Sequence, residues 1–193
     1  ARAIDTTEVQ AMKWVFEPGH SAAEFRARHM MITWVRGSFK NVEGMLEFDP
    51  NDPSKLSVST EIDASTCWTG VEARDNHLRS ADFLRCEQFP KIGFTSTSVE
   101  EVGPTDYQVT GDLTIRGVTR PVTLSVDFHG TWETPWWEDG VDKGPKKRAG
   151  FAAKTQIDRY DFGVSWNDAM AGGGVVVSRL VDIAIDVEAI LVS

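Results

Sequence analysis

His29 is the residue of this chain whose type and position most directly suggest chemistry. It shares one face of an alternating segment, 23–30, with Phe25 and Ala27, so its side chain is expected to point inward. An inward histidine can donate a hydrogen bond to a quinone carbonyl or another polar head group, and it can exchange a proton near neutral pH. The same pattern fits a core histidine that bonds a neighbouring strand or water.

A second candidate group lies on a short predicted helix. Arg74, Asp75 and His77 follow Thr69 and Glu72, whose spacing is that of a capping box with the threonine as N-cap. Arg74 could pair with a phosphate, and with His77 it could receive a polar head group at the mouth of a pocket. An ion pair that anchors the helix explains the same residues, and we favour that interpretation.

Enzyme signatures are weak in this sequence. It contains no H-E-x-x-H, C-x-x-C, P-loop or G-x-G-x-x-G motif, and the neighbouring His20 and Ser21 do not by themselves make a catalytic triad. The histidines are too scattered to indicate a metal site; they are His20, His29, His77 and His129. We therefore predict a non-catalytic protein with no metal and no cofactor of its own.

The elements that would position these residues are β-strands. In the segment 107–128, Tyr107, Val109 and Leu113 share one parity, and the period-two pattern resumes after a break at 116–121. Alternation on both sides of a turn predicts an antiparallel hairpin with one dry face.

The same alternation recurs along most of the chain. It predicts about eight to ten strands, interrupted by one short helical insert behind Thr69 and by a long polar loop, 133–147. Such strands must bury their apolar faces together. Because the sequence has no repeat and no linker, we predict one all-β domain over residues 1–193. We expect an up-and-down antiparallel β-barrel with a short helical insert, whose middle can hold a ligand.

Composition narrows the range of partners. The net charge of −9 and the pI of about 4.9 disfavour nucleic acids and anionic membranes. No apolar run approaches the roughly 20 residues that a membrane helix needs, so we predict no membrane span. Two cysteines in a chain of this length do not make a disulfide scaffold, so Cys67 and Cys86 are interpreted as free thiols.

Six segments, in order and spacing over Lys13 to Val192, resemble the YceI-like polyisoprenoid-binding family. They are GHSAAEFRARHMM at 19–31, RGSF at 36–39, TGVEARDNHLRSADF at 69–83, FPKIGFTST at 89–97, GDLTIRGVTRPVTL at 111–124 and RAGFAAKTQIDRYDFGVSWN at 148–167. This resemblance implies a lipocalin-like barrel with an internal hydrophobic pocket. It also implies a long-chain isoprenoid ligand, such as an isoprenoid quinone or a polyprenyl chain, or a comparable amphipathic lipid.

The predicted lining of such a pocket combines the inward-facing apolar positions with the polar candidates above. It consists of Phe25, Ala27, His29, Val35, Phe39, Leu46, Val58, Ile62, Arg74, His77, Phe94, Leu113, Val126, Phe128 and Phe151. The pattern gives the face of each residue but not whether the interior is hollow, so plain core packing is the alternative for every apolar member.

We predict a lipid carrier or scavenger that holds the tail in the barrel and the head group at its mouth. One alternative is an enzyme that acts on an apolar substrate with His29 as acid or base. Another is a protein-interaction module with Trp136 and Trp137 as anchors. A homodimer is a further possible assembly. The aromatic loop and the WN…GG ending resemble non-exported family members, so we expect a cytoplasmic protein. Because the chain starts at Ala1, export with removal of a signal peptide is the alternative.

Overall fold

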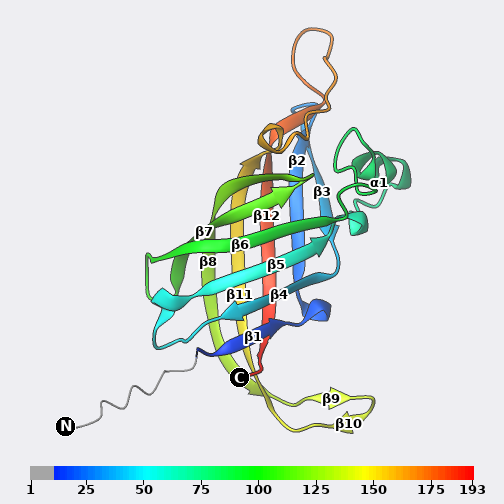
Figure 1. Cartoon of the computed structure of the whole chain (residues 1–193). Helices are drawn as coiled ribbons and strands as arrows, with labels where there is room; N and C mark the ends of the chain where they lie inside the picture. Colours follow the sequence, from blue (N-terminus) through cyan, green and yellow to red (C-terminus); the bar gives the residue numbers. More distant parts are fainter. Residues whose placement is uncertain (1–10) are drawn as a thin grey trace, which may run out of the picture.

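A closed antiparallel barrel forms the body of the molecule. The computed structural model describes residues 11–193, so the first ten residues of the predicted domain lie outside the described part. Eight strands follow one another around the barrel in the order β1, β4, β5, β6, β7, β8, β11 and β12, and β12 pairs with β1 to close it (Figure 1). The predicted all-β barrel with a short helical insert is confirmed.

The strands differ greatly in length. Those of the barrel are β1 (Lys13–Phe16), β4 (Val42–Glu47), β5 (Ser57–Asp63), β6 (Lys91–Glu101), β7 (Asp106–Ile115), β8 (Val118–Thr134), β11 (Lys146–Asp158) and β12 (Val177–Leu191). The remaining strands are β2 (Ala22–His29), β3 (Thr33–Phe39), β9 (Trp137–Glu138) and β10 (Val141–Asp142). Short 3-10 turns lie at Pro18–His20 (η1), Pro53–Lys55 (η2), Ala64–Thr66 (η3) and Arg159–Phe162 (η4).

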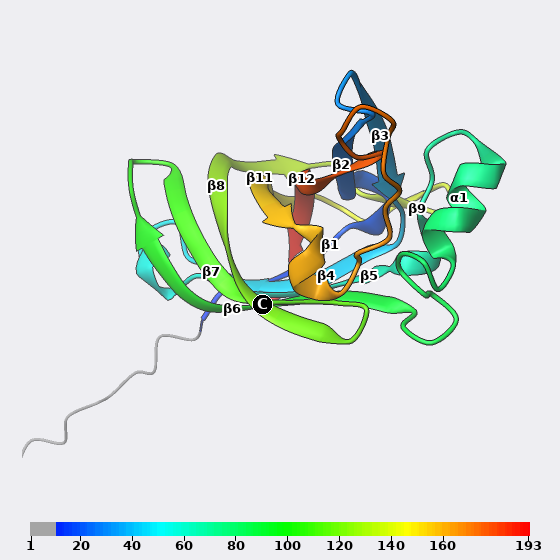
Figure 2. The same ribbon diagram turned by 90° about the horizontal axis from the view of Figure 1, so that it is seen from above.

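Strand β12 has two neighbours on the same side. Its first part pairs with β2, as in Ile183↔Phe25, and its last residues pair with β1, as in Ala189↔Phe16. Because β1 lies between β4 and β12, the β2–β3 hairpin continues the sheet outward from β12 instead of joining the closed ring (Figure 2). The free edge of β3 is met by the insert, since Ser38 and Trp68 exchange two backbone hydrogen bonds of 2.9 Å.

The insert contains one helix, α1 (Glu72–Arg79). The predicted capping box is wrong: the N-cap residue is Val71, which makes no side-chain cap. The Thr69 hydroxyl instead donates to the carboxylate of Asp75, whose Oδ1 also accepts from the Thr69 backbone N–H at 2.8 Å. Asp75 is thus buried in the first turn of the helix. Its carboxylate accepts the hydrogen bonds of Thr69, the residue that was expected to cap the helix. No helix among the described residues is long and apolar enough to span a bilayer.

The segment predicted as a polar loop, 133–147, contains the two-stranded ribbon β9–β10 at one end of the barrel (Figure 1). Trp136 is half-buried, with the Arg148 guanidinium 5.1 Å from the centre of its ring. Trp137 is 63% exposed. The two tryptophans therefore do not share one environment, and their use as anchors for a partner stays a prediction.

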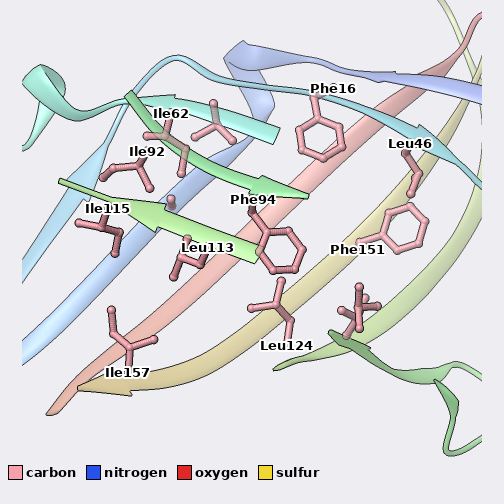
Figure 3. Close-up of a cluster of buried hydrophobic side chains, with 14 of the residues drawn as sticks. Phe16, Leu46, Ile62, Ile92, Phe94, Leu113, Ile115, Leu124, Phe151 and Ile157 are labelled. Carbon is pink, nitrogen blue, oxygen red and sulfur yellow. The ribbon is translucent and has the colours of Figure 1, made fainter. Parts of the chain in front are cut away.

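The inner face of the barrel follows the predicted parity, and its two ends are packed differently. Near β1, the indole N–H of Trp14 donates to the carbonyl of Phe48 at 2.8 Å. The ring of Phe48 lies 4.9 Å from that of Phe128 and 5.3 Å from that of Phe151. Farther along, the inward side chains are mainly aliphatic. Figure 3 shows the two groups, with Phe16, Leu46 and Phe151 on one side and Ile62, Ile92, Ile115 and Ile157 on the other.

Candidate functional site

An apolar cavity of about 190 Å³ lies inside the aliphatic part of the barrel. Strands β2, β3, β5 to β8, β11 and β12 contribute to its wall, and β1 and β4 do not. Inward positions of successive strands supply most of the lining, which includes Ile62, Ile92, Ile115, Leu124, Ile157 and Ile185. Such a wall offers dispersion contacts and no directed hydrogen bonds, so it suits an apolar guest.

Two segments outside the barrel complete the wall. The insert adds Leu78 and Phe83, and the turn η4 with the residues after it adds Phe162 and Val164. Phe83, Phe162 and Val164 are all buried. Trp166 packs against the insert, with its ring centroid 5.4 Å from that of Phe83. These apolar contacts join the insert to the segment after β11 and shield the cavity from water on that side.

Two glycines leave room for phenylalanine rings beside the cavity. The ring of Phe25 lies where a side chain on Gly37 would be, and the ring of Phe94 lies where one on Gly111 would be. Each ring therefore rests against the backbone of the next strand. If either position carried a Cβ atom, the ring would have to move, and the space inside the barrel would change.

The predicted lining residues fall into three places. Those that line the cavity are Phe25, Ala27, Phe39, Ile62, Phe94 and Leu113. Those that belong to the packed core outside the cavity wall are Leu46, Val58, Val126, Phe128 and Phe151. Val35 is half-buried on β3 and also lies outside the wall. The parity was read correctly, but large rings at one end of the barrel occupy the space that a cavity would need.

The polar candidates lie outside the cavity wall. His29 is half-buried at the end of β2, where it pairs with Val177 of β12. Arg74 donates to the hydroxyl and carbonyl oxygens of Thr69 at 2.7 and 3.2 Å. His77 lies 2.8 Å from a carboxylate oxygen of Asp82. The contacts of Arg74 and His77 stabilise the insert, and contact of any of the three with a ligand stays a prediction.

Arg159, at the start of η4, is a wall residue that the predicted lining does not include. It is 5% exposed, and burial lowers the pKa of its guanidinium. The guanidinium donates to the carbonyls of Val164, Trp166 and Ser178 at 2.7, 2.8 and 2.8 Å, and to that of Val177 at 3.1 Å. These bonds fix the segment after β11 against β12 and satisfy the buried cation with backbone oxygens.

Most of the other missed wall residues carried a visible signal. Val181, Ile183 and Ile185 alternate cleanly in the last strand and line the cavity. Cys67 also lines it and, like Cys86, is buried as a free thiol. Burial raises the pKa of Cys67 to about 12, so this thiol is neutral at physiological pH.

One charged cluster lies outside the cavity wall, where β1 closes the barrel against β12. His20 Nδ1 lies 3.1 Å from a carboxylate oxygen of Glu17 and 3.6 Å from one of Glu188. These three groups are close enough to hold a metal ion. Arg148, however, donates to both carboxylates, to Glu188 at 2.6 Å, so a cation already neutralises them.

Comparison with known proteins places this architecture in a family. A model described as "YceI-like domain" matches residues 14–189. Protein YceI of Escherichia coli O17:K52:H18 is 38% identical over 174 residues, which cover 90% of this chain and 83% of that protein. The structure of the Campylobacter jejuni YCEI protein has a TM-score of 0.70 at 27% identity, covering 86% of this chain and 90% of that one.

A more distant solved structure shares the fold alone. It is described as a polyisoprenoid binding domain from Saccharophagus degradans, and it is 13% identical with a TM-score of 0.63. The match covers 95% of this chain and all of that one. The family model, the curated relative and the barrel agree, and this chain belongs to the YceI-like family.

Proposed function

We propose that this protein binds the apolar tail of an isoprenoid lipid, such as an isoprenoid quinone or a polyprenyl chain, in the barrel cavity. The observation that carries the proposal is the aliphatic wall of the cavity, which includes Ile62, Ile115 and Ile185. The family supports it, and so does the description of the Saccharophagus degradans neighbour as a polyisoprenoid binding domain.

The size of the cavity limits how much of a tail it takes. An engineered apolar cavity of about 150 Å³ holds one benzene molecule and no water. A volume of about 190 Å³ therefore suits roughly one or two isoprene units. Each buried methylene contributes about 0.8 kcal/mol, so this end segment alone gives useful affinity. The rest of a long tail then extends through the mouth or displaces wall side chains.

The role that we propose is binding without catalysis. Cys67 places a thiol in the cavity wall, and burial keeps this thiol protonated. The guanidinium of Arg159 is occupied by backbone carbonyls. His29 does not line the cavity, although its pairing partner Val177 does. These groups do not form a nucleophile with a base beside it.

A chain-length series tests the proposal. Geranyl, farnesyl and geranylgeranyl alcohol are titrated by calorimetry, and native mass spectrometry looks for a lipid retained on gentle purification. We expect the gain in affinity per isoprene unit to fall once the cavity is filled. Ile183 lines the cavity, so Ile183→Trp should fill part of the space and weaken binding at least about tenfold. Ala184→Trp, on the outer face of the same strand, is the matched control. Empty preparations and no binding of any alcohol would overturn the proposal.

A further inference from the structure

Two loops lie side by side at the cavity-bearing end of the molecule. They are the β2–β3 turn, 30–32, and the loop 169–175, and we call them together the apex (Figure 1, where the loop is orange). The backbone N–H of Met30 donates to the carbonyl of Val176 at 2.8 Å. The Met31 side chain reaches Gly174, where a Cβ atom would collide with it. The two loops therefore form one surface.

The apex is apolar and exposed. Its residues, 30–32 and 169–175, include no charged side chain, although charged residues make up 25% of the chain. Ile32 is 74% exposed and Met31 is 58% exposed. Met30 and Val175 are exposed beside them. Exposed apolar side chains that are scattered singly need no explanation, but a contiguous group indicates an interaction surface.

The backbone of the turn adds to this indication. Met30 and Met31 have φ angles of 49° and 61°, in the left-handed region that favours glycine and asparagine. A tight hairpin turn normally uses those residues. Here the strained positions carry long apolar side chains, which are 38% and 58% exposed. The cost to folding indicates that these side chains serve an external contact.

A cationic and aromatic layer lies directly behind the apex. The Arg28 guanidinium donates to the carbonyl of Ile32 at 3.4 Å and lies 4.0 Å from the centre of the Trp34 ring. The carboxylates of Asp182 and Asp158 are paired with other arginines, whereas Asp168, next to the apex loop, has no ion pair among the described residues. Arg28 has no carboxylate partner among the described residues. Proteins that insert into a membrane surface place apolar side chains deepest, among the acyl chains, and tryptophan and arginine behind them at the level of the head groups. The apex, Trp34 and Arg28 follow this order.

We propose that the apex docks this protein on a lipid bilayer, with the side chains of Met31 and Ile32 inserted among the acyl chains. Docking there would place the cavity close to the membrane, because His29 at the turn pairs with Val177, a wall residue. The net charge of −9 opposes approach to anionic lipid, but salt screens charges beyond about 8 Å. Delivery of a lipid tail to the cavity rests on the proposed function, whereas docking itself does not.

Vesicle flotation tests the docking. The protein is mixed with vesicles of phosphatidylcholine and phosphatidylglycerol, and we expect it to float with them. The double variant Met31→Ser with Ile32→Ser should reduce the partition coefficient at least about tenfold, with an unchanged melting temperature. The matched control is Trp137→Ser with Val141→Ser, which removes two exposed apolar side chains at the opposite end of the barrel. This control should float like the unaltered protein.

Several results would overturn the docking proposal. One is absence of flotation, and another is loss of flotation in the β9–β10 control but not in the apex variant. A dimer in sedimentation that the apex variant abolishes, without flotation, would assign the surface to a second copy of the chain. The apex variant should bind geranylgeranyl alcohol as the unaltered protein does. If neither binds it but the unaltered protein floats, the proposed function fails and the docking stands.

Discussion

The two ends of the barrel interior obey the same alternation and reach opposite results. At one end, the rings of Phe128 and Phe151 each meet the ring of Phe48 edge to face, and none of the three lines the cavity. Around Ile183, aliphatic side chains face one another across a space of about 190 Å³. Rings from several strands interlock across a narrow barrel, whereas short branched chains do not reach the axis. The aromatic end therefore stabilises the fold, and the aliphatic end leaves space for a ligand.

Truncating one buried side chain at each end should give the largest difference in unfolding free energy between the two ends. Trp14→Ala removes a fully buried indole and its hydrogen bond to Phe48, and should cost about 3–5 kcal/mol of unfolding free energy. Ile183→Ala enlarges an existing space and should cost about 2 kcal/mol, the low end of the range for such truncations. Urea denaturation of both variants measures the difference. Equal losses would contradict the contrast between the ends.

Enlarging one inward side chain at each end should also affect the two ends differently. Phe151→Trp overpacks the aromatic end and should destabilise the fold by about 1–3 kcal/mol. Ile185→Phe grows into free space, so its stability should change by less than about 1 kcal/mol while lipid affinity falls. Thermal unfolding and calorimetric titration of the two variants check this pair. A strongly destabilised Ile185→Phe would mean that the cavity does not accept added volume.

A single methyl group at Gly37 should disturb the cavity without a large loss of stability. Gly37→Ala pushes the ring of Phe25 from its place on β3, and we expect weaker lipid binding at a cost of about 1 kcal/mol in stability. Gly19→Ala is the control, because a Cβ atom there meets nothing within 4 Å. Calorimetry should distinguish the two. Unchanged affinity in Gly37→Ala would show that the ring has another place to go.

The smallest expected effect is a dependence of stability on pH, and it comes from the charged cluster of Glu17, His20 and Glu188 beside β1. Burial raises the pKa of Glu17, but hydrogen bonds from His20 and Arg148 outweigh it and hold the pKa below its usual 4.5. That stabilisation is present above 4.5 and is lost as pH falls through the lowered value. The hydrogen bond to Glu17 raises the pKa of His20 above its usual 6.5. Its contribution is complete below 6.5 and is lost as pH rises through the raised value.

Stability should therefore be greatest between these limits. The melting temperature measured against pH should fall slightly on the alkaline side, and His20→Gln should remove that fall. The effect should be small because the His20 side chain is 63% exposed. Lipid affinity should not follow the same profile, since none of these groups lines the cavity. A parallel change in affinity would show that the two ends are coupled.

Much of this architecture was predictable, because alternation reports which face of a strand is dry. The burial of Tyr107 and Val109, for example, followed from their shared parity. The cavity wall was predictable only in part. The roles of Phe151 and Phe94 differ although both point inward, because volume depends on partners from distant strands. The hydrogen bonds of Arg159 could not be predicted, because its partners are backbone oxygens of an irregular segment that has no periodic pattern.

The pairing of β1 with β12 has a consequence for biosynthesis. Residues at the two extremes of the described chain, such as Trp14 and Leu191, must meet before the ring is complete. While a ribosome is still translating the last strand, the growing sheet has two unpaired edges that other chains can capture. Contacts of such long sequence separation also slow folding. The protein should therefore depend on chaperones most strongly just before its final strand emerges.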